Sequence, residues 1–549
     1  MKAIDGDSWI CENGLVSIYL FLTQGYVMIR KRRKFFSAGV SPQALLFMLL
    51  SLMLLLGPLA SPYPASTAAA AELPSGSAND PVPEYVHNLL GMDWYGIYFQ
   101  DNKTGYATIS FERADNTVGA EYRFNIAAKM TLHSQGNALQ LQMGVSWRFD
   151  DKAPYRLIEL ATRIATGNDE SEIRIRRMNN NYRALITQGT EIRRMELESF
   201  NLTLDDLLAV PLWLQQNPAV GDRISYADLN QETLEIGQGS ARVLKIETRK
   251  VNGIDLTYYT VLESPASGPD MTSVYGADGK PFTTSLGEAF FFRLEPEAIA
   301  VKPDSPMDLF VNNFVGIDTA LGDPAQVIRL KTSLDDRSGS RIGEAPGQSV
   351  TLDAANQRYI VTTAPGQEPR IRPTAEEIDQ NLKATTEIPV NHPKVVDLAR
   401  QAVAGAGTTT EKVARLVQFV ETYIIDDYNA NPLTIFDIIA KRRGDCSEHA
   451  RLFTALARAL AIPCREVSGL AYVGDDLKGF YPHAWNEVVI DGYWVPVDPT
   501  WGQTTIDATH IRFAIDENEM FQIMAAVPSM KITVLEFKTR AGKSISLEK

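Results

Sequence analysis

The stretch Arg443-Gly444-Asp445-Cys446-Ser447-Glu448-His449-Ala450-Arg451 predicts the start of a helix that carries a thiol in its first turn. Asp445 suits the N-cap position, since its carboxylate can accept a hydrogen bond from an amide that has no partner within the helix. Glu448, three residues on, completes a capping box. Apolar residues then recur at helical spacing until Pro463, which cannot continue a helix. Cys446 is therefore expected at the first helical position, where the partial positive charge of the helix end favours a thiolate.

A second stretch, further along the chain, predicts a β-hairpin. Asp491-Gly492 lies between two β-rich runs, and this dipeptide is typical of a two-residue hairpin turn. Such a turn pairs Ile490 with Tyr493. Counting outward along both strands then places His483 diagonally opposite Asp498, within reach of a long side chain.

These two predictions converge on one kind of chemistry. Cys446, His483 and Asp498 supply a nucleophile, a base and a carboxylate that orients the base. The backbone amide of Cys446, at the helix start, is a candidate oxyanion donor. The set predicts acyl transfer through a thioester. Asp498 also has a simpler interpretation, as a cap of the turn that follows it.

Three sequence blocks resemble the motifs of the transglutaminase-like (transglutaminase core) superfamily, bacterial branch. They are RGDCSEHA at 443–450, HAWNEV at 483–488 and PVDPTWG at 496–502. The resemblance covers about residues 391–513. It implies a papain-related α+β core, in which the cysteine helix packs on an antiparallel sheet that carries the histidine and the aspartate. Reactions of that superfamily include transamidation, deamidation, peptide hydrolysis and deglycosylation.

The resemblance also implies a second oxyanion donor upstream of the cysteine. Its candidates are Tyr428, Asn429 and Asn431. Trp485, Trp494 and Trp501 are expected either to wall the site or to form the core of the hairpin.

Two alternatives use the same residues differently. His449 is a rival base three positions after Cys446, although no carboxylate is expected to orient it. A zinc site from Cys446, His449, Cys464 and His483 is disfavoured: no C-x-x-C is present, and a mostly helical connection would place Cys464 about 27 Å from Cys446. We therefore predict two free thiols and neither a metal nor a cofactor.

Composition sets broad limits on the function. The chain has 549 residues, of which 45% are hydrophobic and 22% charged, as in ordinary globular proteins. At roughly 150 residues per domain this suggests about three units. The net charge of −14 argues against a nucleic acid partner.

The N-terminal region predicts export. A basic cluster at 30–34 precedes an apolar run at 44–56, and four alanines at 68–71 offer a cleavage site. Translation is expected to start at Met28. The segment is either a cleaved signal peptide or a retained membrane anchor, which would tether the protein. Both outcomes predict an exported protein in the periplasm or another extracytoplasmic space.

The remaining chain is expected to divide into several parts. The predicted division is 1–27, an extension upstream of the true start; 28–71, the signal peptide or anchor; 72–92, a lead-in; 93–320, a β-rich domain; 321–378, a small β segment and linker; and 379–549, the transglutaminase-like catalytic domain. The β-rich domain is expected to form one large twisted antiparallel sheet. A helix over 204–216, capped by Thr203 and interrupted at Pro211, is expected to pack on it.

Two functions follow from these observations. The first is an exported cysteine enzyme that acts on protein or peptide amides in the cell envelope, as a peptidase, an amidase or a transglutaminase. The second is a non-catalytic envelope scaffold that retains the transglutaminase-like fold for binding. Hydrolysis is preferred over transamidation, because the sequence has no calcium-loop pattern and the β-rich domain could hold an extended peptide.

Overall fold

The structure is a computed structural model, and its described residues form two compact units. Described are residues 2–4, 8–10, 89–99, 101–116, 119–134, 137–167, 169–179, 181–198, 200–251, 254–286, 290–302, 304, 314–335, 342–353, 355, 358–427, 434–514, 527, 530–542 and 544–546. The units are Met1–Phe36 and Ser37–Lys549. In the first unit, β1 (Lys2–Ile4) and β2 (Ser8–Ile10) pair antiparallel.

The predicted signal or anchor segment, 28–71, lies outside the described residues. Within the described ranges, no helix combines the length and the apolar character needed to cross a bilayer.

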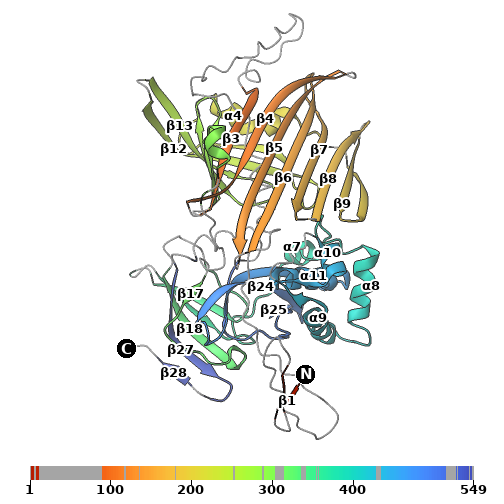
Figure 1. The fold of residues 1–549 in the computed structure, drawn as a ribbon, viewed down its shortest axis with the longest axis vertical. Helices are drawn as coiled ribbons and strands as arrows, with labels where there is room; N and C mark the ends of the chain where they lie inside the picture. Colours follow the sequence, from red (N-terminus) through yellow and green to blue (C-terminus); the bar gives the residue numbers. More distant parts are fainter. Residues whose placement is uncertain are drawn as a thin grey trace, which may run out of the picture. The chain divides into compact units, whose positions relative to one another are not determined.

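One antiparallel sheet of fourteen strands occupies the chain from Gly91 to Glu295 (Figure 1). In their spatial order the strands are β10 (Glu191–Leu197), β9 (Asn181–Gln188), β8 (Asp169–Met178), β7 (Leu157–Thr166), β6 (Asn137–Asp150), β5 (Gly119–Ser134), β4 (Asn102–Asn116), β3 (Gly91–Phe99), β16 (Phe290–Glu295), β15 (Pro281–Leu286), β14 (Met271–Gly276), β13 (Ile254–Ser264), β12 (Ile236–Val251) and β11 (Arg223–Leu229). Two meanders meet where β3 pairs with β16, with Tyr98 opposite Phe291. The prediction of one large antiparallel sheet is confirmed.

Alternating side chains explain why this segment forms a sheet. In β9, the buried residues Tyr182, Ala184 and Ile186 alternate with more exposed neighbours such as Arg183. This period of two places Tyr182, Ala184 and Ile186 on the buried face of the strand. Across neighbouring strands the buried rings of Phe124 and Trp147 lie 5.3 Å apart. Such aromatic pairs add to the stability that burial provides.

The predicted helix over 204–216 forms as two short helices, α3 (Leu204–Leu207) and α4 (Ala209–Leu214). Thr203 caps the first of them through a capping box, as predicted. The break falls at Leu208, just ahead of Pro211. Proline has no N–H to donate to the Leu207 carbonyl, and its ring crowds that carbonyl. Residues of α4 pack with β12 and β13 in one apolar cluster. A further short helix, α5 (Glu297–Ala300), follows β16.

Two smaller sheets follow along the chain. The first has the order β17 (Val315–Gly316), β24 (Gly479–Ile490), β23 (Cys464–Tyr472) and β26 (His510–Ala514), with β25 (Tyr493–Val497) also paired to β24. The second has the order β19 (Gln348–Asp353), β20 (Arg358–Thr363), β18 (Val327–Asp335), β27 (Lys531–Thr539) and β28 (Ser544–Ser546), and a 3-10 turn, Pro324–Gln326, precedes β18. The pairing of β18 with β27 joins segments that are far apart in the sequence.

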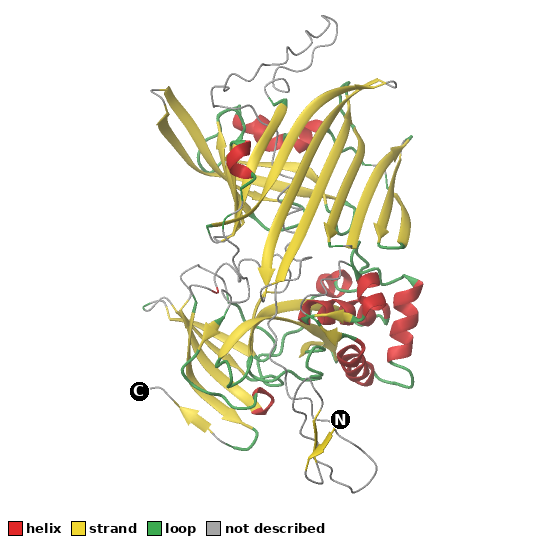
Figure 2. Cartoon of the chain, viewed as in Figure 1, coloured by secondary structure: helices red, strands yellow, loops and turns green. Residues whose placement is uncertain are grey.

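A group of helices accompanies the first of these sheets (Figure 2). They are α7 (Ala375–Gln380), α8 (Pro393–Ala402), α9 (Thr409–Tyr423), α10 (Ile435–Lys441) and α11 (Cys446–Ala459). Helix α11 packs against β23, β24, α8 and α9. Between α9 and α11 the chain also forms a short parallel pair, β21 (Ile425–Asp426) with β22 (Arg443–Gly444).

Two apolar cores place the first sheet between the helices and the second sheet. Val488 and Val497 share a core with α8, α9 and α11. Leu470 and Phe480 instead share a core with residues of β18, β20 and β27, Leu334 among them. The sheet is therefore buried on both faces. This arrangement fixes the start of α11 against one surface of β24.

We expect Leu334→Ala to destabilise the second sheet by about 2–5 kcal/mol, because the change leaves a cavity in the core between the two sheets. Leu352→Ala is the matched control: Leu352 lies in the same sheet but is 57% exposed, against 0% for Leu334. Its effect should stay within about 0.5 kcal/mol. Urea denaturation of the full chain, followed by tryptophan fluorescence, measures both. Equal shifts for the two variants would contradict this description of the core.

Candidate active site

The start of α11 is a closed capping box. The Asp445 carboxylate accepts a hydrogen bond from the Ser447 backbone N–H at 2.8 Å, and the Glu448 carboxylate accepts one from the Asp445 backbone N–H at 2.7 Å. Cys446 is the first helical residue, as predicted. Position 444 has room only for glycine, because a Cβ there would lie 2.4 Å from the Cβ of Glu448.

The Cys446 thiol is buried, and its surroundings favour the protonated form. Burial raises the pKa of the Cys446 thiol well above its ordinary value, and the neighbouring Asp445 carboxylate adds to this rise. A hydrogen bond from the Ala484 backbone acts in the opposite direction. The net rise is opposite in direction to the shift expected from the helix end alone. The cost of burying a charge exceeds the benefit of the helix end.

One side chain fastens α11 to β24. The amide nitrogen of Asn486 donates to the Ala450 carbonyl at 3.0 Å and to the Thr454 hydroxyl at 2.8 Å, and the residue is fully buried. These bonds fix the rotation of the helix against the strand. They thereby set the position of Cys446 relative to the part of β24 that precedes Asn486.

Cys464 lies alongside α11, and not at the distance from Cys446 that a continuous helix would give. Its sulfur is 3.6 Å from the Thr454 hydroxyl, alongside the middle of α11. The estimate of about 27 Å assumed a nearly continuous helix. The helix instead ends at Ala459, and the chain reverses at Ala461, which has a φ of 58°. Cys446 and Cys464 are both free and buried, and burial raises the pKa of Cys464 to about 12.

The predicted hairpin forms in the predicted register. Ile490 pairs with Tyr493, and Asn486 pairs with Val497. Asp491 and Gly492 both have positive φ, at 51° and 77°, which is the backbone of the two-residue turn that this dipeptide favours. The register brings β24 and the end of β25 together at the site.

His483 and Asp498 meet as this register predicts. The His483 Nε2 lies 3.0 Å from the Asp498 Oδ2. The other carboxylate oxygen, Oδ1, accepts hydrogen bonds from the backbone N–H groups of Thr500 at 2.8 Å and Trp501 at 3.3 Å. Asp498 therefore caps the following turn and contacts the histidine at the same time. Burial alone would raise the pKa of Asp498, but His483 and His510 outweigh it and lower that pKa below its ordinary value.

His510 is a site residue that the sequence did not reveal. Its Nε2 lies 3.3 Å from the Asp498 Oδ2, and its Nδ1 lies 3.2 Å from the Asp507 carbonyl oxygen and 3.3 Å from the Asp507 Oδ1. His510 opens β26, which pairs with β23 and reaches the site from across the sheet. A hairpin register cannot predict such a contact. The only local signal was an aspartate three positions before one of the six histidines.

Two of the three tryptophans border the histidines. The Trp501 ring stacks on His483 at a centroid distance of 4.1 Å and an interplanar angle of 9°. Trp485 lies on the same side of β24, 6.0 Å from His483. Trp494 lies elsewhere, with the Arg465 guanidinium 4.1 Å above its ring. Of the two expected roles, Trp494 therefore has the one in the core of the hairpin, since its ring is buried away from the histidines.

His449, the rival base, has other contacts. Its Nδ1 lies 2.7 Å from the Asp445 carbonyl oxygen, one helical turn back. Its Nε2 lies 3.8 Å from the Asp426 carboxylate, beyond hydrogen-bond distance, and nothing in the sequence indicated this contact. The pairing of β21 with β22 brings Asp426 there, which a local pattern cannot show.

The oxyanion candidates Tyr428, Asn429 and Asn431 lie outside the described residues.

Within the described part of the chain, one group of side chains has the spacing of a metal site. Ligand atoms of His483, Asp498 and His510 lie within 4.8 Å of one another. This is not the set considered from the sequence, because His510 takes the place of the cysteines and His449. The same atoms make the hydrogen bonds described above, so they also satisfy one another without an ion.

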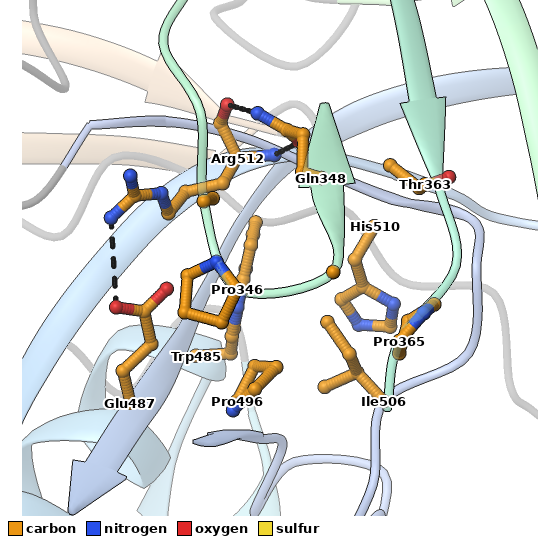
Figure 3. Close-up of a pocket in the computed structure, with 12 residues that line it drawn as sticks. Pro346, Gln348, Thr363, Pro365, Trp485, Glu487, Pro496, Ile506, His510 and Arg512 are labelled. Carbon is orange, nitrogen blue, oxygen red and sulfur yellow. Dashed lines mark hydrogen bonds and ion pairs between the residues drawn. The ribbon is translucent and has the colours of Figure 1, made fainter. Parts of the chain in front are cut away.

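A small pocket borders His510 on the side of the second sheet (Figure 3). There the Gln348 side chain pairs with the Arg512 backbone like a strand: its amide nitrogen donates to the Arg512 carbonyl, and its oxygen accepts from the Arg512 N–H, both at 2.8 Å. The Arg512 guanidinium faces the Glu487 carboxylate at 3.5 Å. Strand β26 is thereby fastened on both sides, by β23 and by Gln348.

A cysteine at the start of a helix, packed on an antiparallel sheet with a buried histidine–aspartate pair, defines an α+β thiol site. Comparison with known families agrees: residues 396–499 match the transglutaminase-like superfamily, so this part of the chain is a transglutaminase-like domain. Kyphoscoliosis peptidase of Mus musculus is 32% identical over 90 residues, and that of Homo sapiens is 31% identical over 90 residues. The matched stretch is 16% of this chain and 14% of each relative.

Solved structures show weaker likeness. A candidate cysteine protease from Cytophaga hutchinsonii has 19% identity and a TM-score of 0.24, over 41% of this chain and 88% of that one. A β-barrel-like protein of unknown function from Brucella abortus has 8% identity and a TM-score of 0.28, over 37% of this chain and 94% of that one. At TM-scores this low, neither likeness bears on function.

We expect Asn486→Ala to lower the free energy of unfolding by about 1–3 kcal/mol, since it removes two buried hydrogen bonds between α11 and β24. Asn201→Ala, at an exposed position, is the control and should have little effect. Thermal unfolding followed by circular dichroism compares them. An Asn486→Ala variant as stable as the control would show that the helix does not depend on this contact.

Proposed function

We propose that the protein is a cysteine-dependent enzyme that transfers the acyl group of a protein or peptide amide. Cys446 is the nucleophile, His483 the base and Asp498 the residue that orients the base. The observation that carries the proposal is the buried His483–Asp498 hydrogen bond beside the helix start that bears Cys446. The transglutaminase-like match over 396–499 supports the same chemistry. We also infer the papain-related arrangement of helix and sheet that this family implies.

The protonation of the thiol decides the first step. Because the Cys446 thiol is protonated at rest, its proton must leave as the sulfur attacks the amide carbon. The Nε2 of His483 faces Asp498, so the proton passes to the other ring nitrogen, Nδ1. The S–C bond forms and the C–N bond breaks, and the leaving amine takes the proton from His483. An acyl thioester on Cys446 and a free amine result.

The second step releases the acyl group. Water or an amine gives a proton to His483 and attacks the thioester carbon, and the sulfur leaves and recovers the proton. The developing oxyanion in both steps needs donors, and the backbone N–H of Cys446, without a partner in the helix, is one candidate. Asp498 stays ionised throughout and stabilises the imidazolium of His483.

We favour water over an amine as the acceptor. Transfer to an amine requires water to be excluded while the amine enters. The rings of Trp485 and Trp501 beside His483 could help exclude water, which keeps transamidation as the runner-up. The large antiparallel sheet offers strand edges on which an extended peptide could pair, which fits hydrolysis of a protein substrate.

A binding scaffold is the second candidate function. The burial of all three side chains, together with the raised pKa of Cys446, is the observation that favours it. In that case the transglutaminase-like domain would recognise a protein without reacting with it.

We further propose that the protein acts outside the cytoplasm, on protein or peptide in the cell envelope. This proposal depends on the basic and apolar pattern within 28–71. The same segment would tether the protein to the membrane if it is retained.

Asp498→Asn should slow the reaction of Cys446 by about a hundredfold or more, because an amide cannot hold His483 in the required tautomer. The measurement is the rate of carbamidomethylation of Cys446 by iodoacetamide, followed by mass spectrometry of the native protein, with Cys464 as the internal reference. His449→Gln is the control and should be mild. Loss of reactivity in His449→Gln but not in Asp498→Asn would assign the base to His449.

The acceptor is tested with casein and a fluorescent primary amine. Hydrolysis predicts new peptide ends or released ammonia, without incorporation of the amine, and both should be lost in Cys446→Ser. Amine incorporation that depends on Cys446 would establish transamidation instead. If wild type and Cys446→Ser behave alike on casein and in the alkylation assay, the scaffold is the better description.

A further inference from the structure

We propose that His510 is a positioning residue for the site: it fixes the Asp498 carboxylate for His483 through a hydrogen bond from Nε2, while Asp507 anchors its Nδ1. This inference rests on the proposed function and deepens it. It adds a second histidine and a second aspartate to the cysteine, histidine and aspartate found from the sequence.

The first step of the argument is that Asp498 has two imidazole partners. Its Oδ2 faces the Nε2 of His483 at 3.0 Å and the Nε2 of His510 at 3.3 Å. Its Oδ1 is bound to two backbone N–H groups of the following turn. Rotation of the carboxylate would break contacts on both oxygens. His510 thus restrains the one oxygen that His483 uses.

The second step is that the anchor of His510 is itself fixed. The Asp507 Oδ1, which faces the His510 Nδ1, also accepts hydrogen bonds from the Thr509 N–H at 3.0 Å and the Thr509 hydroxyl at 2.5 Å. The Asp507 Oδ2 accepts one from the Gln503 side chain at 2.8 Å. The backbone of Gln503 in turn exchanges two hydrogen bonds with Asp498, both at 2.8 Å. The contacts form a closed circuit from Asp498 through Gln503, Asp507 and His510 back to Asp498.

The third step is that packing holds the His510 ring. Trp485 lies edge-on to it at a centroid distance of 5.2 Å, and Trp501 at 5.3 Å. The ring also borders the pocket, and Ile506 is among the residues that line it (Figure 3). The imidazole is fully buried and has both nitrogens engaged. The two tryptophan rings and the two hydrogen-bonded nitrogens therefore set the orientation of the His510 ring.

The charge of the ring agrees with this role. Burial alone would lower the pKa of His510, but Asp507 and Asp498 raise it to about 9. At neutral pH both nitrogens therefore carry protons and can donate to both carboxylates. A neutral imidazole has one N–H and must leave one carboxylate without its donor. The charged and titratable groups around the ring are Asp498, Asp507, His483 and, next along β26, Arg512 with its partner Glu487.

The test compares wild type with His510→Phe, His510→Gln and Asp507→Asn in the full chain. Phenylalanine keeps the ring but removes the donor, glutamine keeps a neutral donor, and Asp507→Asn keeps His510 but removes the charge of its anchor. The probe is iodoacetamide, and the quantity is the alkylation rate of Cys446 between pH 6 and pH 10, with Cys464 as the reference. Circular dichroism establishes that each variant is folded.

At pH 7, His510→Phe should slow alkylation of Cys446 by about tenfold or more, and His510→Gln should stay much closer to wild type. The ratio of the wild-type rate to the His510→Phe rate should fall as the pH rises through about 9, toward the ratio that His510→Gln gives, because a neutral His510, like glutamine, keeps a donor but carries no charge. The same fall is expected for Asp507→Asn. The ratio of its alkylation rate to the His510→Phe rate should fall at a pH about one to two units lower than the wild-type ratio does.

Four results would overturn the inference. A folded His510→Phe variant that reacts like wild type at pH 7 removes the role of His510. If the ratio of the wild-type rate to the His510→Phe rate is lower than expected and does not change with pH, His510 serves only in packing. If His510→Phe does not fold, an unshifted pH profile in Asp507→Asn decides against the proposal. If wild-type Cys446 reacts no faster than Cys464, the proposed function fails first, and the role of His510 fails with it.

Discussion

The buried carboxylate of Asp498 is the constraint on which the rest of the site depends. An ionised carboxylate without water is stable only when it is paired and fully hydrogen-bonded. Asp498 meets this requirement with two imidazoles and two backbone N–H groups. The imidazoles come from β24 and β26, on opposite sides of β23, and the amides come from the turn after β25. The sheet must therefore be complete before the charge can be buried.

The parts of the site that the sequence predicted are those set by neighbouring residues. The capping box of Asp445 and Glu448 spans four positions, and the register of the hairpin follows from Asp491-Gly492. Both depend on local geometry that a few side chains decide. His510 and the contact between His449 and Asp426 depend instead on which strands become neighbours. No pattern within a few residues carries that information.

The same distinction applies to the fold. Alternation of apolar and polar residues predicted one large antiparallel sheet, because each strand carries its own signal. The pairing of β18 with β27 joins distant segments and has no such signal. For the pKa of Cys446, two effects of different size oppose each other. A helix end favours a charge by about 0.3–1 kcal/mol, whereas full burial shifts a pKa by as much as about 3–5 units. The capping pattern indicates the helix end at Cys446 but carries no information on how deeply the thiol is buried.

The buried, protonated Cys446 also bears on how such an enzyme would survive exposure to oxidants. Peroxide attacks the thiolate, and the sulfenic acid that forms first leads on to products that cannot be reversed. A thiol whose pKa is raised by burial offers little thiolate, and its small exposed surface limits the approach of the oxidant. In the proposed mechanism the sulfur would react only as His483 takes its proton. If Cys446 is the nucleophile proposed above, its burial would thus protect it from air and peroxide whenever no reaction is under way.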